Sequence, residues 1–155
     1  MKLISPSFRN GKAMPSKYTC DGANVSPSLV WADLPGRTRS LTLIVHDPDA
    51  PGGDWVHWVI FNMKPGMSGL GEGMPPEPVL DQGIRQGMND FNQIGYSGPC
   101  PPQGRHRYVF RLFALDSELP LLSGATRKQI LAAMSGHILE ESELCALYER
   151  VLVRR

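Results

Sequence analysis

The chain has 155 residues and a mass of 17.1 kDa, which is the size of one domain, so residues 1–155 are treated as a single domain. Its formal net charge of +1 argues against a nucleic-acid-binding protein that relies on a basic surface. No apolar run approaches the roughly 20 residues that a membrane-spanning helix needs. The N-terminal segment also lacks the apolar stretch of a secretory signal, so we expect a cytoplasmic protein.

Glycine and proline are frequent, with 16 and 14 residues. At average usage, about 7% and 5%, a chain of this length would contain about 11 and 8. Turn formers at this frequency favour many short strands over long helices. The three cysteines, Cys20, Cys100 and Cys145, are odd in number and far apart, which suggests neither a disulfide framework nor a zinc site of the CxxC type.

Residues 40–47 have the alternating pattern of a β-strand, with Asp47 and His46 on opposite faces. The segment at 47–53 contains two prolines and two glycines, which end the strand and turn the chain.

A second strand is predicted at residues 55–62, in which His57 shares a face with Val59 and Phe61. An antiparallel pairing with the preceding strand would place His57 and Asp47 near the same end of the sheet.

Residues 66–104 are rich in Gly and Pro and show little periodicity, and a loop of that length is unusual unless it is functional. The clearest strand is residues 105–115, in which His106 and Tyr108 lie on one face.

A helix is predicted at residues 126–134, because Thr126 and Gln129 form the T-x-x-Q pattern of a capping box. A further helical segment is expected at residues 140–148. The predicted fold is therefore mainly β, an antiparallel β-sandwich with one or two short helices near the C-terminus.

Four side chains with useful chemistry lie at or near the ends of predicted strands: Asp47, His57, His106 and Tyr108. If these strand ends converge, one carboxylate, two imidazoles and a phenol share a pocket. Imidazoles, a phenol O–H and loop N–H groups suit a phosphate or carboxylate group. The sequence therefore predicts an anion-binding site, with packed or surface histidines as the plain structural alternative.

A metal site is a second interpretation, because metal-ligand residue types are close together in the sequence. The candidate ligands are His46, Asp47, Asp49, Asp54 and His57. Against it, His46 and Asp47 point to opposite faces of one strand, and Asp is common in turns of this kind.

A hydrolase is a third interpretation, with His57 and His106 as general acid and base. Ser97 does not meet the G-x-S-x-G pattern of a nucleophile elbow, because Pro99 occupies the second glycine position. Cys100 is a better candidate nucleophile, although a structural thiol is the simpler explanation.

Four stretches of the sequence resemble the phosphatidylethanolamine-binding protein family, which includes Raf kinase inhibitor protein, and especially its bacterial and archaeal members. They are YTCDGANVSPSLVW at 18–31, DPDAP at 47–51, HWVIFN at 57–62, and GYSGPCPP at 95–102 followed by HRY at 106–108. The sequence MSGHIL at 134–139 also resembles the C-terminal helical region of the family.

The resemblance implies a central antiparallel β-sandwich with short helices and an anion pocket between strand ends. It also implies a cis peptide bond between Ala50 and Pro51. The implied ligand-binding residues are Asp47, His57, Gly98, Pro99, Pro101, Pro102, His106 and Tyr108, with no metal and no cofactor.

The resemblance also suggests partners. A small phosphorylated or carboxylated ligand is expected, in a binding protein rather than an enzyme. Regulation of a kinase or protease and formation of a homodimer are further hypotheses. The chain ends soon after Tyr148 and lacks the longer C-terminal segment of eukaryotic members, so binding of phosphatidylethanolamine itself is not carried over.

Overall fold

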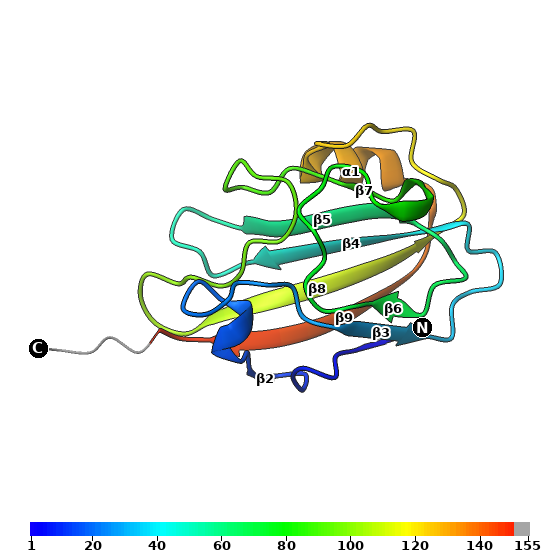
Figure 1. Cartoon of the computed structure of the whole chain (residues 1–155). Helices are drawn as coiled ribbons and strands as arrows, with labels where there is room; N and C mark the ends of the chain where they lie inside the picture. Colours follow the sequence, from blue (N-terminus) through cyan, green and yellow to red (C-terminus); the bar gives the residue numbers. More distant parts are fainter. Residues whose placement is uncertain (151–155) are drawn as a thin grey trace, which may run out of the picture.

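The structure, a computed structural model, describes residues 1–150 as two unequal β-sheets and one α-helix (Figure 1). The six-stranded sheet has the order β2 (Lys12–Ala13), β9 (Ile138–Tyr148), β8 (His106–Leu115), β4 (Ser40–Asp47), β5 (Trp55–Met63) and β7 (Arg85–Gln86). The three-stranded sheet has the order β1 (Lys2–Ile4), β3 (Leu29–Ala32) and β6 (Gly69–Leu70). All neighbours are antiparallel except β2 and β9.

The helical elements are short: α1 (Arg127–Met134) and the 3₁₀ turns η1 (Ser16–Tyr18) and η2 (Asp81–Gly83). Over residues 1–150, none of them is long and apolar enough to cross a membrane.

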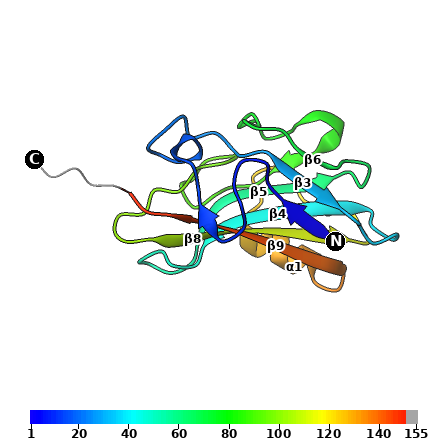
Figure 2. The same cartoon turned by 90° about the horizontal axis from the view of Figure 1, so that it is seen from below.

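The large sheet lies between the small sheet on one face and α1 on the other (Figure 2). Alternating residues of its central strands supply both cores, so that Val45 and Phe110 pack toward the small sheet while Ile44 and Phe113 pack toward α1. The mainly β fold is thus confirmed, with unequal sheets and a single α-helix.

The predicted strand at 40–47 is confirmed as β4, and the strands at 55–62 and 105–115 are confirmed within one residue as β5 and β8. β4 and β5 are antiparallel neighbours, and Asp47 lies opposite Trp55 at their joined end.

The predicted helical segment at 140–148 is wrong, because these residues belong to β9. β9 pairs with β8 in a long antiparallel ladder that runs from His106 opposite Tyr148 to Leu115 opposite Ile138. Glu, Leu and Ala favour helix locally, but the ladder and the burial of Leu144 override that preference.

The Gly- and Pro-rich segment at 66–104 contains only β6, η2 and β7 as regular elements. Part of it runs along the edge of β5 that faces away from β4, where Gly87 N–H donates to the Val59 carbonyl and Ser97 N–H donates to the His57 carbonyl. The segment therefore covers a sheet edge and places Ser97 beside His57.

Helix α1 begins with the predicted capping box. The Gln129 N–H donates to the Thr126 hydroxyl at 3.3 Å, and the Thr126 N–H donates to the Gln129 side-chain oxygen at 3.0 Å. Ile130 and Met134 are fully buried against the sheet, so the cap fixes a helix that completes one of the two cores.

Replacing Thr126 with Ala should lower the free energy of unfolding by about 1 kcal/mol, because one capping hydrogen bond is lost. Urea denaturation would measure it. Thr126→Ser is the matched control, and an equal loss in both variants would contradict the capping role.

Candidate functional site

A cavity of about 240 Å³ lies at the end of the large sheet where β4, β5 and the start of β8 meet. Six of the eight predicted site residues line it: Asp47, His57, Pro101, Pro102, His106 and Tyr108. The structure therefore brings the predicted carboxylate, imidazoles and phenol together. Gly98 and Pro99 are the two that do not line it.

His57 reaches the cavity because β5 contains a β-bulge. Val45 of β4 pairs with Trp58, but the next residue, His46, pairs with Val56, so His57 has no partner on β4. The predicted face of His57 is therefore wrong. Val59 stays in the core under α1, whereas the His57 ring meets the Tyr108 ring at 5.2 Å. Bulges commonly redirect a side chain in this way.

His57 is held as a neutral imidazole with one unprotonated nitrogen. Its Nδ1 lies 2.6 Å from the Ser97 carbonyl oxygen, which only accepts, so Nδ1 carries the proton. Burial lowers the pKa of His57, against the opposing effect of the Ser97 carbonyl and of Asp47. Among the described residues, Nε2 has no hydrogen-bond partner. It is therefore a free acceptor.

His106 is bound at both ring nitrogens. Nδ1 lies 2.7 Å from Asp47 Oδ2, and Nε2 lies 3.1 Å from the Gln103 carbonyl oxygen. Both partners only accept, so the imidazolium, which donates from both nitrogens, satisfies the arrangement fully. Asp47 also accepts the N–H of Asp49 at 2.8 Å. Asp47 and His106 are thus joined by a buried hydrogen bond within the cavity wall.

Asp49 has a positioning role that the sequence did not indicate. It accepts hydrogen bonds from the backbone N–H, Nε and Nη2 of Arg107, at 2.9, 3.0 and 2.9 Å. Hydrogen bonds from Arg107 lower the pKa of Asp49 to about 2. Together, Asp47 and Asp49 fasten the loop after β4 to the first residues of β8.

Tyr108 lies between the two histidines, 5.2 Å from the His57 ring and 6.4 Å from the His106 ring, measured between centroids. Its side chain is 1% exposed, and its hydroxyl has no hydrogen-bond partner among the described residues. Burial and the neighbouring Asp47 raise the pKa of the phenol, so it stays protonated as a donor. An unpartnered buried hydroxyl costs free energy unless something else accepts its proton.

The mouth of the cavity is apolar. Trp55 and Phe91 meet edge to face at 5.6 Å and are 38% and 40% exposed. Phe91 also contacts the His57 ring at 5.2 Å. Phe91 lies in the irregular segment at 66–104, where the sequence shows little periodicity, so no pattern indicated that it contacts His57.

Gly98 and Pro99 support the cavity from behind. The Gly98 N–H donates to Asn24 Oδ1 at 2.8 Å, and the Pro99 carbonyl accepts the Cys20 N–H at 3.1 Å. The Gly98 N–H is therefore not free to hold an anion. A Cβ on Gly98 would lie 2.1 Å from the Tyr18 carbonyl oxygen, so glycine is needed for this close approach.

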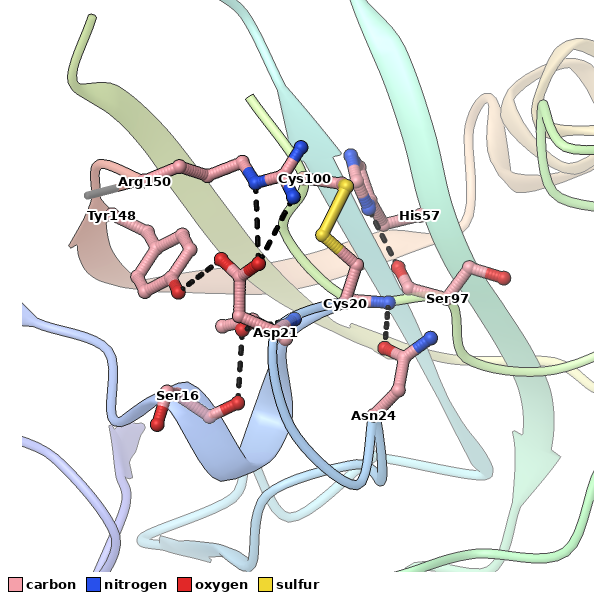
Figure 3. The surroundings of a disulfide bond; sticks show 11 residues. Ser16, Cys20, Asp21, Asn24, His57, Ser97, Cys100, Tyr148 and Arg150 are labelled. Atoms are coloured by element: carbon pink, nitrogen blue, oxygen red, sulfur yellow. Dashed lines mark hydrogen bonds and ion pairs between the residues drawn. A yellow bond between two sulfur atoms is a disulfide. The ribbon is translucent and has the colours of Figure 1, made fainter. Parts of the chain in front are cut away.

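Cys20 and Cys100 form a disulfide across 80 residues of sequence (Figure 3). The expectation of no disulfide is wrong, because the fold brings two distant loops together and sequence spacing does not report that contact. Cys100 lines the cavity, but its sulfur is bonded to Cys20 and is not a nucleophile in this form. Cys145 is the free cysteine of the described residues.

The Ala50–Pro51 bond is trans, since residues 1–150 contain no cis peptide bond, and the expectation of a cis bond there is wrong.

The five residues of the metal interpretation are not brought together. His46 and Asp54 pair with each other at 2.7 Å on the opposite face from Asp47. His46 Nε2 accepts from Arg111 at 3.1 Å, and Asp54 accepts from Arg127. Guanidinium groups occupy the acceptors that a cation would need.

Replacing Gly98 with Ala should lower the free energy of unfolding by about 1–3 kcal/mol, because the added methyl group meets the Tyr18 carbonyl. Thermal unfolding would measure it. Gly36→Ala is the control, since a Cβ there meets nothing within 4 Å. Equal melting temperatures for Gly98→Ala and the parent would contradict the close approach.

The lowered pKa of His57 predicts a pH dependence of stability. In the unfolded chain a histidine binds its proton near pH 6.5, whereas buried His57 resists it. The unfolded state is therefore favoured as pH falls below about 6.5, by at most about 1.4 kcal/mol per pH unit. Chemical denaturation at pH 7 and pH 5 should show a larger loss for the parent than for His57→Asn. Equal losses would contradict a buried neutral His57.

The phosphatidylethanolamine-binding protein family model matches residues 4–149 of this chain. The UPF0098 protein of Methanothermobacter thermautotrophicus is 51% identical over 150 residues, which cover 97% of this chain and 99% of that protein. The UPF0098 protein of Aquifex aeolicus is 46% identical, over 97% of this chain and 89% of that protein.

Two solved structures are similar throughout. A phosphatidylethanolamine-binding protein homolog from Chlamydia trachomatis has a TM-score of 0.90 and 41% identity, with 97% of each chain covered. Escherichia coli YbcL, described as a member of the mammalian family, has a TM-score of 0.90 and 30% identity, with 97% of this chain and 98% of that chain covered. This chain therefore belongs to the phosphatidylethanolamine-binding protein family.

Proposed function

We propose that this protein binds a small phosphorylated or carboxylated molecule in the cavity at the end of β4, β5 and β8. The observation that carries the proposal is the pair of unsatisfied polar atoms on its wall. The Tyr108 hydroxyl is a buried donor without a hydrogen-bond partner among the described residues. His57 donates from Nδ1 to the Ser97 carbonyl, which leaves Nε2 as an acceptor on the cavity side of the ring. A ligand that supplies both partners removes both deficits.

These two atoms specify the charge state of the ligand. A phosphate or carboxylate oxygen accepts from Tyr108, but another such oxygen beside His57 Nε2 would bring two acceptors together. One proton must lie between them, either on the imidazole or on the ligand. Binding is therefore coupled to the uptake of one proton at pH values where both partners are deprotonated.

Asp47 and His106 bind each other at 2.7 Å in the neighbouring wall. The carboxylate already accepts from His106 and from the Asp49 N–H, and its negative charge also acts on the Tyr108 hydroxyl. Its role is to hold His106 and the loop rather than to contact the ligand.

The aromatic mouth favours a ligand that also carries an apolar group. Trp55 and Phe91 offer exposed ring surface beside the polar end of the cavity, and Pro51, Pro101 and Pro102 add apolar wall. Stacking against such rings adds about 0.5–1.5 kcal/mol to affinity. Phenyl phosphate has an anionic end and an aromatic ring, so it is a suitable probe ligand for this cavity.

Calorimetric titration with phenyl phosphate should show tighter binding at pH 6 than at pH 8. A phosphomonoester has its second pKa near 6, so at pH 8 both the ligand and His57 are deprotonated. Binding that takes up one proton weakens by at most about tenfold per pH unit, so we expect the affinity to differ by at least about tenfold between pH 6 and pH 8. Titrations in two buffers of different ionisation enthalpy should show uptake of one proton at pH 8.

The variants Tyr108→Phe and His57→Asn should each weaken binding, by about tenfold or more at pH 6, since a hydrogen bond to a charged group is lost. His57→Asn should also flatten the pH dependence. His137→Asn is the matched control, because His137 is exposed and pairs with Asp116 outside the cavity. Undiminished binding by both cavity variants, or no binding by the parent at either pH, would overturn the proposal.

The hydrolase hypothesis, the regulation of a kinase or protease, and homodimer formation stay predictions. For the hydrolase hypothesis, the unprotonated Nε2 of His57 is a candidate general base. Cys100 is not available as the nucleophile of that reaction while it is bonded to Cys20.

A further inference from the structure

We propose that the Cys20–Cys100 disulfide is a redox switch that controls the order of the 100–105 loop and, through it, the affinity of the cavity. The first half of this inference stands on the structure of the loop alone. The second half rests on the proposed function, because it concerns binding in the same cavity.

The 100–105 loop forms part of the cavity wall but has few other attachments. Cys100, Pro101 and Pro102 line the cavity. Among the described residues, the one hydrogen bond made by this loop joins the Gln103 carbonyl to His106 Nε2 at 3.1 Å. Residues 102–105 are exposed. Apart from the burial of Pro101, the disulfide is therefore the main restraint on the loop.

The chain on the N-terminal side of the loop is held without the disulfide. Ser97 N–H donates to the His57 carbonyl, Gly98 N–H donates to Asn24, and the Pro99 carbonyl accepts from the Cys20 N–H. These bonds end at Pro99. Motion after reduction should therefore begin at Cys100 and end at His106, where β8 starts.

The loop that carries Cys20 is also held independently. Backbone bonds close it, from Thr19 N–H to the Ser16 carbonyl and from Asn24 N–H to the Lys17 carbonyl. Asp21 accepts from the Tyr148 hydroxyl at 2.6 Å and from Arg150 at 3.1 Å (Figure 3). Reduction should therefore free the cavity side of the bridge and leave the Cys20 side in place.

The exposure of the two cysteines sets the course of the reduction. Cys20 is exposed and Cys100 is half-buried, so a dithiol reductant attacks the Cys20 sulfur as its thiolate. The S–S bond breaks and Cys100 leaves with the electron pair and takes up a proton. The second thiol of the reductant then attacks the mixed disulfide, releasing the Cys20 thiolate, which is protonated as the reductant closes to its own disulfide. Two electrons and two protons pass to the protein.

Such a bridge responds to its compartment, because thiol systems reduce accessible disulfides in a reducing cytoplasm and oxidising compartments preserve them. Reduction leaves the atoms of His57 and Tyr108 in place but loosens the wall facing them. If the loop must become ordered when the ligand binds, the free energy of that ordering is subtracted from the binding free energy, so affinity falls.

The structural test compares oxidised protein with protein reduced by dithiothreitol. Thiol counting in denaturant should give one thiol before and three after reduction, from the three cysteines and one disulfide. Backbone NMR order parameters of Gln103, Gly104 and Arg105 should fall from about 0.85 to below about 0.6. Those of Lys17 and Asn24 should not change. Unchanged order parameters at all three loop residues would overturn the switch.

Variants separate the bridge from other effects of the reductant. Cys20→Ser breaks the bridge without changing a residue that lines the cavity, and Cys20→Ser/Cys100→Ser also excludes bridges between molecules. Both should reproduce the reduced loop and no longer respond to dithiothreitol. Cys145→Ser is the control and should respond as the parent does. If the variants do not fold, reduction and reoxidation of the parent decide the question.

The binding test titrates phenyl phosphate into both forms at pH 6. Reduction should weaken binding about fivefold or more, and reoxidation should restore it. A freed loop with equal affinity in both forms would overturn control of the site. If neither form binds phenyl phosphate, the proposed function fails, and the order parameters then decide the switch by themselves.

Discussion

Strand β8 pairs with β9 along its whole length and with β4 from Val109 to Leu115, and the candidate site depends on the first three residues of β8, which extend past the pairing with β4. Its first residues supply His106, Arg107 and Tyr108. Asp47, the last residue of β4, binds His106, and Asp49 in the loop that follows binds Arg107. Successive side chains of a strand point to opposite faces, so His106 and Tyr108 face the cavity while Arg107 faces outward and binds Asp49.

The polar groups of the cavity are of two kinds, those that bind each other and those that face the cavity. Asp47 and His106 satisfy each other, so the wall keeps its shape without a ligand. The Tyr108 hydroxyl has no hydrogen-bond partner among the described residues, and His57 keeps Nε2 as an acceptor because its Nδ1 donates to Ser97. Ligand-binding pockets are typically apolar with a few polar atoms that lack a partner within the protein, whereas an empty packing cavity is lined by apolar atoms alone.

Segments far apart in the sequence meet behind the cavity. The loop after η1, the segment from Ser97 to Cys100 and the end of β9 converge around the disulfide (Figure 3). Hydrogen bonds and the disulfide join these segments, whereas residues 102–105 beyond them are exposed. A disulfide at this point restrains a loop that the hydrophobic core does not reach.

Local patterns determined a large part of this protein. Alternation located β4, β5 and β8, the capping box located α1, and the residue types at strand ends identified Asp47, His57, His106 and Tyr108 as neighbours. These signals succeed because strand alternation and helix capping are properties of adjacent residues, and the sheet then brings strand ends together.

Tertiary structure decided the rest. The pairing with β8 made a strand of residues 138–148, the bulge in β5 turned His57 into the cavity, and the approach of two loops joined Cys20 to Cys100. Each of these depends on contacts between residues distant in the chain, which leave no periodic signal in the sequence. The sequence by itself determined which chemical groups are present and which strands carry them. Only the folded chain decided their protonation, their direction and the covalent restraint on the loop beside them, because those follow from burial and from long-range contacts.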